Sequence, residues 1–485
     1  MATIFILLIL PLITSALSAW GRLARLRYWF TLLAGVTHLV ASLYCLVTGI
    51  NPFAPRSWLA VDPLAAFFLV ILSHTFVLVT LYAPGFLQRM QGEEYARSRH
   101  WFYPALNFYL LANTLVLMVQ QFAMIWVVIE LTTFSLVPLM YFYRTKASLE
   151  AVWKYLFLVS LGLVFLFVGI LFLGLAGRGW LDPSDFTVRN MTENSLRLDP
   201  LWLKASFIFV LVGLSAKIGL APMHPGDVDA TSNAPAPIAA LMAGSLRSTA
   251  IAALLRFYQV IAHTEVRPFA QRLLVIAGLL SLAVAAVYMW RSRNYKRMLA
   301  YSSVEHLGII TLGIGIGGVA LLGALLHLLF NSFGKTALFF MAGNIHQSYG
   351  TRKIESITGL LRRLPWSGFV WALAFFYIVG TPPFGIFFSE VLLLKGMIHF
   401  ANWVPLVILL ILLMTIFIGM GRSVLGMLQT PVATAELVPA PVEKFNFSHA
   451  LALYAILLSV PLALFRPAAL FDALRAIMTA LGTTL

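Results

Sequence analysis

Five ionisable residues lie within long apolar stretches of the sequence, where an isolated charge is costly. They are Glu130, Lys217, Glu305, Lys335 and Glu390. A charge near the middle of a bilayer costs about 2.5–3.5 kcal/mol on insertion scales. Such residues therefore face a protein interior or a water-filled path. A series of acids and bases in these positions is typical of proton or ion movement.

Lys217 lies five residues before Pro222, near the end of an apolar run. Because proline has no backbone N–H to donate, Pro222 predicts a broken or kinked helix whose freed carbonyls need other partners. A lysine held in an apolar interior loses and regains its proton near neutral pH more readily than an exposed one. The alternative is an ammonium group that reaches the cytoplasmic surface, since the run ends near His224.

Glu130 has apolar residues on both sides, and its short side chain cannot reach a membrane surface. It serves either in proton transfer or in a structural ion pair between helices. The two roles are compatible, because a Glu–Lys pair would couple the two protonation states.

His327, Asn331 and Lys335 are spaced four residues apart and therefore share one helical face. Together with water they could form a hydrogen-bonded wire for protons. The alternative is a purely structural polar contact between helices. Glu305 and His306 lie about nine residues past the basic Lys296 and Arg297, so they fit either the membrane interface or the interior.

Glu390 follows Pro382 and Pro383, which predict a second broken helix. Two interrupted helices, each with an ionisable residue, indicate inverted repeats around a central ion site.

The elements that position these residues are membrane helices. The chain is 61% hydrophobic and only 11% charged, whereas a soluble domain carries roughly 25% charged residues. The single cysteine, Cys45, excludes an internal disulfide and a cysteine-ligated cluster. The net charge of +15 comes from short loops between apolar runs, which argues against nucleic acid as a partner.

Fourteen runs have the length of about 20 residues that a ~30 Å bilayer core requires. We expect transmembrane helices over 3–19, 28–50, 63–87, 101–120, 122–143, 151–176, 202–222, 235–260, 270–290, 297–316, 318–347, 367–396, 403–428 and 449–468. A Pro-rich linker at 429–447 precedes the last of them.

The distribution of Lys and Arg predicts the orientation of these helices. With the N-terminus outside, the cytoplasmic loops hold more than twice as many basic residues as the outer loops. This bias predicts an inner-membrane protein with both termini outside. Because the sequence holds no catalytic triad, nucleotide loop, haem motif or metal motif, any redox reaction must occur on another subunit.

Several stretches together resemble the proton-translocating, antiporter-like subunits of respiratory complex I and of Mrp antiporters, and most of all hydrogenase-4 component F. Besides Glu130, these stretches are SLEAVWKY (148–155), FVLVGLSAKIGLAPMH (209–224), APAPIAALMAG (234–244), KRMLAYSSVEHLGI (296–309), ALLHLLFNSFGKTALFF (324–340), YGTRKI (349–354) and PPFGIFFSE (382–390).

The resemblance implies an all-α polytopic membrane protein of about fourteen helices, with two inverted five-helix repeats and with helices 7 and 12 broken. The corresponding regions are 1–100 for helices 1–3, 101–260 and 261–428 for the two repeats, and 429–485 for the linker and last helix. It further implies that Glu130 and Lys217 form the first half-channel pair and that Glu390 is the terminal proton site.

The resemblance also implies partners. They are other membrane subunits, lipid, and a peripheral redox arm whose NiFe and Fe–S centres are absent from this chain. Protons would move along Glu/Lys/His residues while electrons pass through the partner subunits.

The sequence departs from the family pattern in four places. The usual His-Xaa-Trp-Leu-Pro-Asp reads HPGDVD from His224 to Asp229, which keeps only the histidine and the final acid. Asn233 replaces a glutamate, and Asn331 replaces a histidine that titrates. Ser248 stands where many pumps have a lysine; its neighbour Arg247, effectively always charged, fits a fixed electrostatic gate.

Two alternatives to a redox-driven proton pump remain open. One is a redox-independent module for cation/proton antiport or inorganic-carbon uptake. The other is a structural membrane subunit whose proton path has decayed, as Asn331 and Ser248 would indicate.

Overall fold

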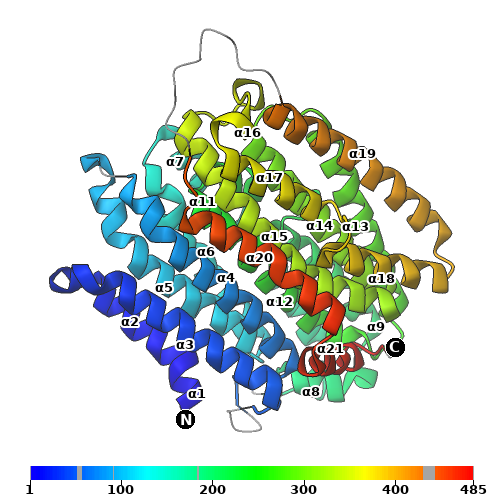
Figure 1. Ribbon diagram of the computed structural model, residues 1–485. Coiled ribbons are helices and arrows are strands. Elements are labelled where there is room, and N and C mark those ends of the chain that lie inside the picture. Colours follow the sequence, from blue (N-terminus) through cyan, green and yellow to red (C-terminus); the bar gives the residue numbers. More distant parts are fainter. Residues whose placement is uncertain (1, 52–56, 91, 183–184, 430–442, 484–485) are drawn as a thin grey trace.

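The computed structural model describes residues 1–485 apart from 1, 52–56, 91, 183–184, 430–442 and 484–485. The described residues form a bundle of helices without a β-strand, in which three isolated bridges join loops. The ends of the chain marked N and C both lie at the lower end of the bundle in Figure 1.

Each predicted span contains at least one helix. In chain order these helices are η1 (Phe5–Ile9) with α2 (Leu10–Ala19), α3 (Arg27–Thr48), α4 (Pro63–Gln88), α5 (Ala96–Met118), α6 (Phe122–Met140), α7 (Lys146–Ala176), α9 (Pro200–Ile218) with α10 (Pro225–Asn233), α11 (Ala236–Leu241) with η7 (Met242–Leu246) and α12 (Arg247–Ile261), α13 (Arg267–Trp290), α14 (Tyr295–Ile316), α15 (Gly318–Tyr349), α17 (Pro365–Ile378) with α18 (Gly385–His399), α19 (Trp403–Gln429) and α20 (Phe447–Phe465).

Short elements lie at the ends of these helices. They are α1 (Ala2–Ile4), η2 (Gly21–Leu26), η3 (Glu93–Tyr95), η4 (Tyr141–Tyr143), α8 (Val188–Glu193), η6 (Ser195–Arg197), η8 (Ile354–Ser356), α16 (Leu360–Arg363) and α21 (Ala468–Ala480).

Several of the long helices begin directly after a polar residue whose side chain caps the first turn. Asp62 accepts a hydrogen bond from the backbone of Ala65, Thr145 from Ser148, and Asn294 from Lys296. Each bond satisfies an N–H group that the first helical turn leaves without a partner. Eleven helices in the described part of the chain are long and apolar enough to cross a membrane.

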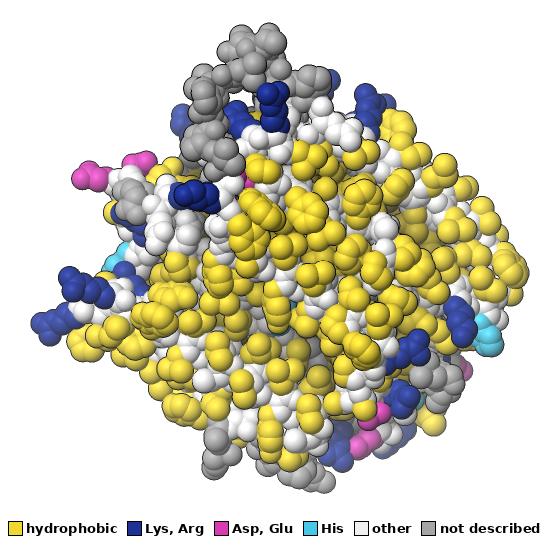
Figure 2. Space-filling view, in the orientation of Figure 1, with side chains coloured by type: hydrophobic (Ala, Val, Ile, Leu, Met, Phe, Trp, Pro, Cys, Tyr) yellow, Lys and Arg dark blue, Asp and Glu magenta, His cyan; other side chains and the backbone are white. Residues whose placement is uncertain are grey.

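The helices divide into a central and a peripheral group. The most apolar 18-residue windows of Ala236–Ile261 and Tyr295–Ile316 are completely buried, and that of α15 is 94% buried. In contrast, those of α7, α13 and α19 are less than half buried. Figure 2 shows a broad apolar face between two ends where charged side chains gather. This pattern is that of a multi-pass membrane protein, whose polar interior is carried by the central helices.

Both predicted helix breaks are present, and the backbone has the same sequence of features at each. The segment after α9 contains Gly219, with φ of 91°, and the segment after α17 contains Gly380, with φ of 73°. Both values lie in the left-handed region that glycine adopts without steric cost. A proline with a cis peptide bond follows in each case, at Pro222 and at Pro383, and a new helix then begins. The division into inverted repeats at 101–260 and 261–428 remains a prediction.

Two parts of the predicted helix layout were wrong. The helix of the seventh span ends at Ile218, and a further helix, α10, follows the break where a loop was predicted. The polar sequence of α10 hides it from a search for apolar runs, although Pro225 suits the first turn of a helix. The amphipathic helix α21 was also missed. Most of the predicted linker at 429–447 lies outside the described residues.

Candidate functional site

Lys217 lies in the last turn of α9, just before the first break, and is only 2% exposed. Its ammonium group donates hydrogen bonds to Thr133 Oγ1 on α6, at 2.8 Å, and to Tyr155 OH on α7, at 3.2 Å. The ammonium nitrogen also lies 5.6 Å from the centre of the Tyr155 ring. These contacts exclude the alternative in which the lysine extends to the membrane surface.

Glu130 lies on α6, close to Lys217 but without a direct bond to it. One carboxylate oxygen accepts a hydrogen bond of 3.3 Å from Ser160 on α7, and the other is buried without a hydrogen-bond partner among the described residues. The carboxylates of Glu130 and Asp227 both interact electrostatically with Lys217. The predicted pair is therefore arranged as two neighbouring charges, with Thr133 as the direct partner of the lysine.

Asp227 and Arg247 form a buried ion pair that the sequence analysis missed in part. Asp227 Oδ2 lies 2.5 Å from a guanidinium nitrogen of Arg247, and each residue is 1% exposed. The same nitrogen donates to Thr231 Oγ1 at 2.8 Å. Asp227 Oδ1 and two further nitrogens of Arg247 are buried without a hydrogen-bond partner in the described residues. The sequence predicted Arg247 as a fixed gate but did not indicate Asp227 as its partner.

Lys335 is fully buried in the middle of α15. Its ammonium group donates to Ser302 Oγ at 2.7 Å and to the carbonyl of Leu299 at 3.4 Å. Ser302 also interacts electrostatically with the carboxylate of Glu305, three residues later on the same helix. The positive charge of Arg247 also acts on Lys335. This interaction links Lys335 electrostatically to the first half of the molecule. Glu305 is 6% exposed and thus lies inside the bundle.

A chain of histidines leads away from Lys335 toward Glu390. His306 Nδ1 lies 2.9 Å from His327 Nε2, and His327 Nδ1 lies 3.0 Å from Ser389 Oγ. The hydroxyl of Ser389 donates to the carbonyl of Ile386, at 2.7 Å. It therefore accepts from His327 Nδ1–H, and a neutral His327 then accepts from His306 Nδ1–H. This tautomer leaves a free lone pair on His306 Nε2, which is buried without a partner in the described residues.

Glu390 follows Ser389 directly and lies at the second helix break. Its carboxylate lies so close to Gly380 that a side chain at that position would collide with it. Glu390 also interacts electrostatically with Glu305. The break thus places the Glu390 carboxylate against Gly380, and Glu390 is the next residue after Ser389, where the bonded histidine chain ends.

Two of the departures from the family pattern, Asn331 and Ser248, lie in the interior. Asn331 is 3% exposed, and its side-chain carbonyl is buried without a partner among the described residues. Ser248 donates to the carbonyl of Gly244, within its own helix. Neither side chain interrupts the bonds from Lys335 to Ser302 or from His306 to Ser389.

Asp229 and His224 lie away from this interior line. Asp229 is half-buried and forms ion pairs with the half-exposed Lys154, at 3.7 Å, and Arg297, at 3.2 Å. The His224 ring contacts the stacked rings of Tyr288 and Tyr301. These two residues stand at the cytoplasmic end of the bundle predicted from the charges. No cluster of three metal-binding side chains occurs among the residues that the structure describes.

The sequence family described as "NADH:quinone oxidoreductase/Mrp antiporter, TM" matches residues 120–419, which include every residue of this interior line. The chain belongs to this family. Its relatives include a hydrogenase-4 component F homolog of Methylacidiphilum infernorum (isolate V4), 33% identical over 420 residues that cover 82% of this chain and 87% of the relative.

Further similarities are more distant. NADH-quinone oxidoreductase subunit N of Desulforudis audaxviator (strain MP104C) is 30% identical, over 74% of this chain and 70% of the relative. A chain of the Mrp complex from Dietzia sp. DQ12-45-1b superposes with a TM-score of 0.84 at 17% identity, over 99% of both chains. A chain of the membrane-bound sulfane sulfur reductase, an archaeal respiratory membrane complex, gives 0.85 at 19% identity, over 99% of this chain and 98% of that one. These superpositions show that the family fold extends over nearly the whole chain.

Proposed function

We propose that this chain is the proton-translocating membrane subunit of a redox-driven assembly of the hydrogenase-4 or complex I type. The observation that carries the proposal is the interior line from Glu130 to Glu390. It contains two buried lysines, each hydrogen-bonded to a neutral hydroxyl group rather than to a carboxylate. A lysine held in this way exchanges a proton more readily than one locked in an ion pair.

The first half of the line loads a proton at Lys217. Thr133 and Tyr155 fix the ammonium group, while Glu130 and Asp227 set the local electrostatic potential. Because an arginine is effectively always protonated, Arg247 does not carry the proton itself. Its charge lies between the two lysines, and Asp227 partly neutralises it. The centre of the line therefore transmits an electrostatic effect from one lysine to the other.

The second half passes the proton from Lys335 to Glu390. The free lone pair of His306 Nε2 is the entry point, because this nitrogen is buried without a hydrogen-bond partner among the described residues. When Nε2 accepts a proton, Nδ1 releases one to His327, which in turn releases one toward Ser389. Each transfer breaks one N–H bond and makes a new N–H bond or, at Ser389, an O–H bond. The Ser389 hydroxyl then gives up the proton that it donates to Ile386, which passes to Glu390. Glu390 at the second break receives the proton next to Ser389.

The assembly around the chain follows from its relatives and its charge distribution. Redox chemistry would take place on partner subunits with NiFe and Fe–S centres in a peripheral arm, next to further membrane subunits. The location would be the inner membrane with both termini outside, as the basic loops predict. The genes adjacent to the coding sequence test this directly: a nickel–iron large subunit and an iron–sulfur subunit would support a hydrogenase-type arm, and a lone large soluble partner would support inorganic-carbon uptake.

The decisive experiment is proton uptake by the reconstituted complex. We expect Lys217→Ala and Glu390→Gln each to abolish uptake, while Lys204→Ala, at an exposed position of the same helix α9, and the exposed Glu355→Gln leave it intact. Unchanged uptake in both interior variants would refute proton translocation and favour the structural role. Uptake that needs only a cation gradient, with no electron donor, would favour the redox-independent transporter.

A further inference from the structure

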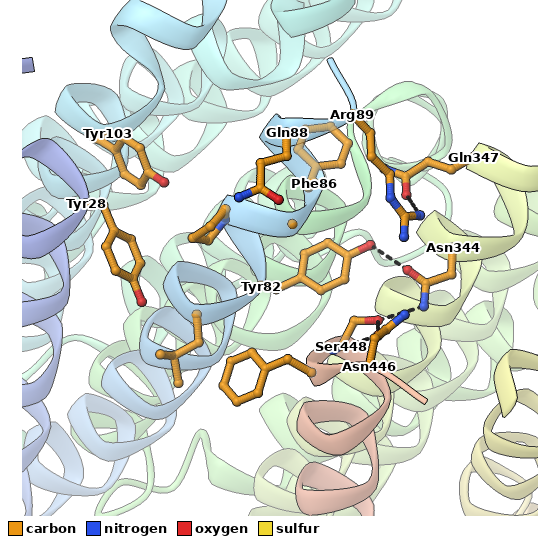
Figure 3. Close-up of a pocket in the computed structure, with 14 residues that line it drawn as sticks. Tyr28, Tyr82, Phe86, Gln88, Arg89, Tyr103, Asn344, Gln347, Asn446 and Ser448 are labelled. Carbon is orange, nitrogen blue, oxygen red and sulfur yellow. Dashed lines mark hydrogen bonds between the residues drawn. The ribbon is translucent and has the colours of Figure 1, made fainter. Parts of the chain in front are cut away.

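A groove lies away from the interior line, at the end of the bundle where α4 and α15 terminate and α20 begins. Its volume is about 580 Å³. Figure 3 shows Tyr28 and Tyr103 on one side and Arg89, Gln347 and Asn344 on the other, with Tyr82 between them. Helix α4 also contributes Pro84 and Gly85 to the lining.

The polar groups of the groove favour an anion. Its lining includes Arg89 but neither an aspartate nor a glutamate. Arg89 donates a hydrogen bond to the neutral side-chain carbonyl of Gln347, at 2.5 Å, and forms no ion pair within the described residues. The side-chain nitrogen of Gln347 is buried without a hydrogen-bond partner in the same part of the chain. The guanidinium N–H groups of Arg89, which lines the groove, match the oxygens of a phosphate group.

The surroundings of the groove favour a lipid as the source of that phosphate. Phe447, which lines it, is 61% exposed and begins the membrane helix α20. Leu33 on α3 and Tyr454 on α20 extend this apolar surface toward the middle of the membrane, at 54% and 49% exposure. A ligand that fits both regions has an anionic head and apolar chains. Basic pockets between helices at the cytoplasmic side are typical sites for such head groups.

We propose that this groove binds one anionic phospholipid, with the phosphodiester at Arg89 and Gln347 and the acyl chains along Phe447 and α3. Gly85 gives a direct way to block it, because a Cβ there would meet no atom within 4 Å and the added side chain would occupy the groove. The proposal does not depend on proton translocation, since none of these residues belongs to the interior line.

The test uses the full chain in nanodiscs that contain phosphatidylglycerol and phosphatidylcholine in equal amounts, followed by native mass spectrometry. We expect the wild type to retain phosphatidylglycerol preferentially. Arg89→Gln and Gly85→Leu should each reduce the retained lipid about tenfold or more, as loss of a charged hydrogen bond would do. The matched controls are Arg362→Gln, an exposed arginine outside the groove, and Gly174→Leu, another position where a Cβ meets no atom within 4 Å.

Three results would overturn the proposal. Equal retention of the two lipids would show that the groove does not select an anionic head. Displacement of the lipid by inorganic phosphate would assign the site to free phosphate. If Arg89→Gln released a neighbouring subunit from the assembled complex but left lipid retention by the chain unchanged, the groove would be a protein interface. Unchanged melting temperatures of both groove variants would show that the effect is not a folding defect.

Discussion

Asp227 and Arg247 join the helix that follows the first break, α10, to a neighbouring helix, α12. Oδ2 of Asp227, on α10, lies 2.5 Å from a guanidinium nitrogen of Arg247, the first residue of α12. Both side chains are almost completely buried. Removing one partner of a buried pair leaves an uncompensated charge and costs about 3–5 kcal/mol. The pair therefore holds the broken helix against its neighbour and also sets the potential between Lys217 and Lys335.

We predict that Asp227→Asn both destabilises the protein and abolishes proton uptake, because Arg247 is left buried with its full charge. Asp227→Asn combined with Arg247→Gln removes both charges and should recover most of the lost thermal stability, but not uptake. Melting temperature in detergent and proton uptake in vesicles measure the two effects separately. Recovery of uptake in the double variant would show that the pair is only structural.

Asp229 lies two residues after Asp227 on the same helix, and the effects of the two residues on stability can be compared. Its ion pairs with Lys154 and Arg297 involve half-exposed cations, and pairs of this kind contribute about 0–1 kcal/mol. Asp229→Asn should therefore lower the melting temperature much less than Asp227→Asn. An equal decrease in both variants would contradict the assignment of Asp227 as the buried partner.

The histidine chain predicts a selective effect of Ser389. Ser389→Ala removes the acceptor of His327 Nδ1–H and thereby releases the tautomer that leaves His306 Nε2 free. We expect proton uptake to fall at least several-fold, with a stability loss near the ~1 kcal/mol typical of one hydrogen bond. Ser332→Ala is the matched control, because Ser332 is equally buried and bonds only to a carbonyl three residues earlier, at 2.7 Å. Equal uptake in the two variants would argue against transfer through His327.

The breaks and the buried charges could be predicted from the sequence because each leaves a strong local signal. Proline within an apolar run predicts an interruption, and Pro222, Pro382 and Pro383 do lie at the two breaks. A lysine such as Lys217 stands out against its apolar neighbours. The same local reasoning explains why each predicted span contains a helix.

Asp227 was missed because its significance arises only in three dimensions. It lies in a polar stretch, where an acid attracts no attention, and its partner Arg247 is twenty residues away on another helix. The family motif instead indicated Asp229, two residues after Asp227, whose side chain forms ion pairs with Lys154 and Arg297. Thr133, Tyr155 and Ser302 were missed for the same reason, since a hydroxyl becomes part of a proton line only through the lysine that reaches it.

Close packing of α7 against α9 gives a prediction about the position of Lys217. A Cβ at Gly213 would lie 2.5 Å from the backbone nitrogen of Leu166 and 2.7 Å from the carbonyl oxygen of Gly162. Gly213→Ala should therefore separate the two helices, cost about 1–3 kcal/mol, and draw Lys217 away from Tyr155. Gly174→Ala, where a Cβ meets open space, is the control for helix propensity. A melting temperature of Gly213→Ala equal to that of the control would contradict this packing.

Glu443 connects the chain before α20 to the start of α17 and predicts a pH dependence of stability. One of its carboxylate oxygens accepts hydrogen bonds from the backbone N–H groups of Trp366, at 3.0 Å, and Ser367, at 2.9 Å. The other accepts from the Ser367 hydroxyl, at 2.6 Å, and contacts His449. Burial opposes ionisation of Glu443, but the hydrogen bonds from His449 and Ser367 outweigh it and lower its pKa below the ordinary value of 4.5.

A carboxylate whose pKa is lower in the folded state stabilises that state fully at a pH above its unfolded pKa. The contribution is lost as the pH falls through that value toward the folded pKa. Between about pH 5 and pH 3, the melting temperature of the wild type should therefore fall more steeply than that of Glu443→Gln, which has no proton to bind at this position. Glu355→Gln, at an exposed carboxylate, should follow the wild type. Parallel curves for wild type and Glu443→Gln would show that this carboxylate does not fasten α17 to the chain before α20.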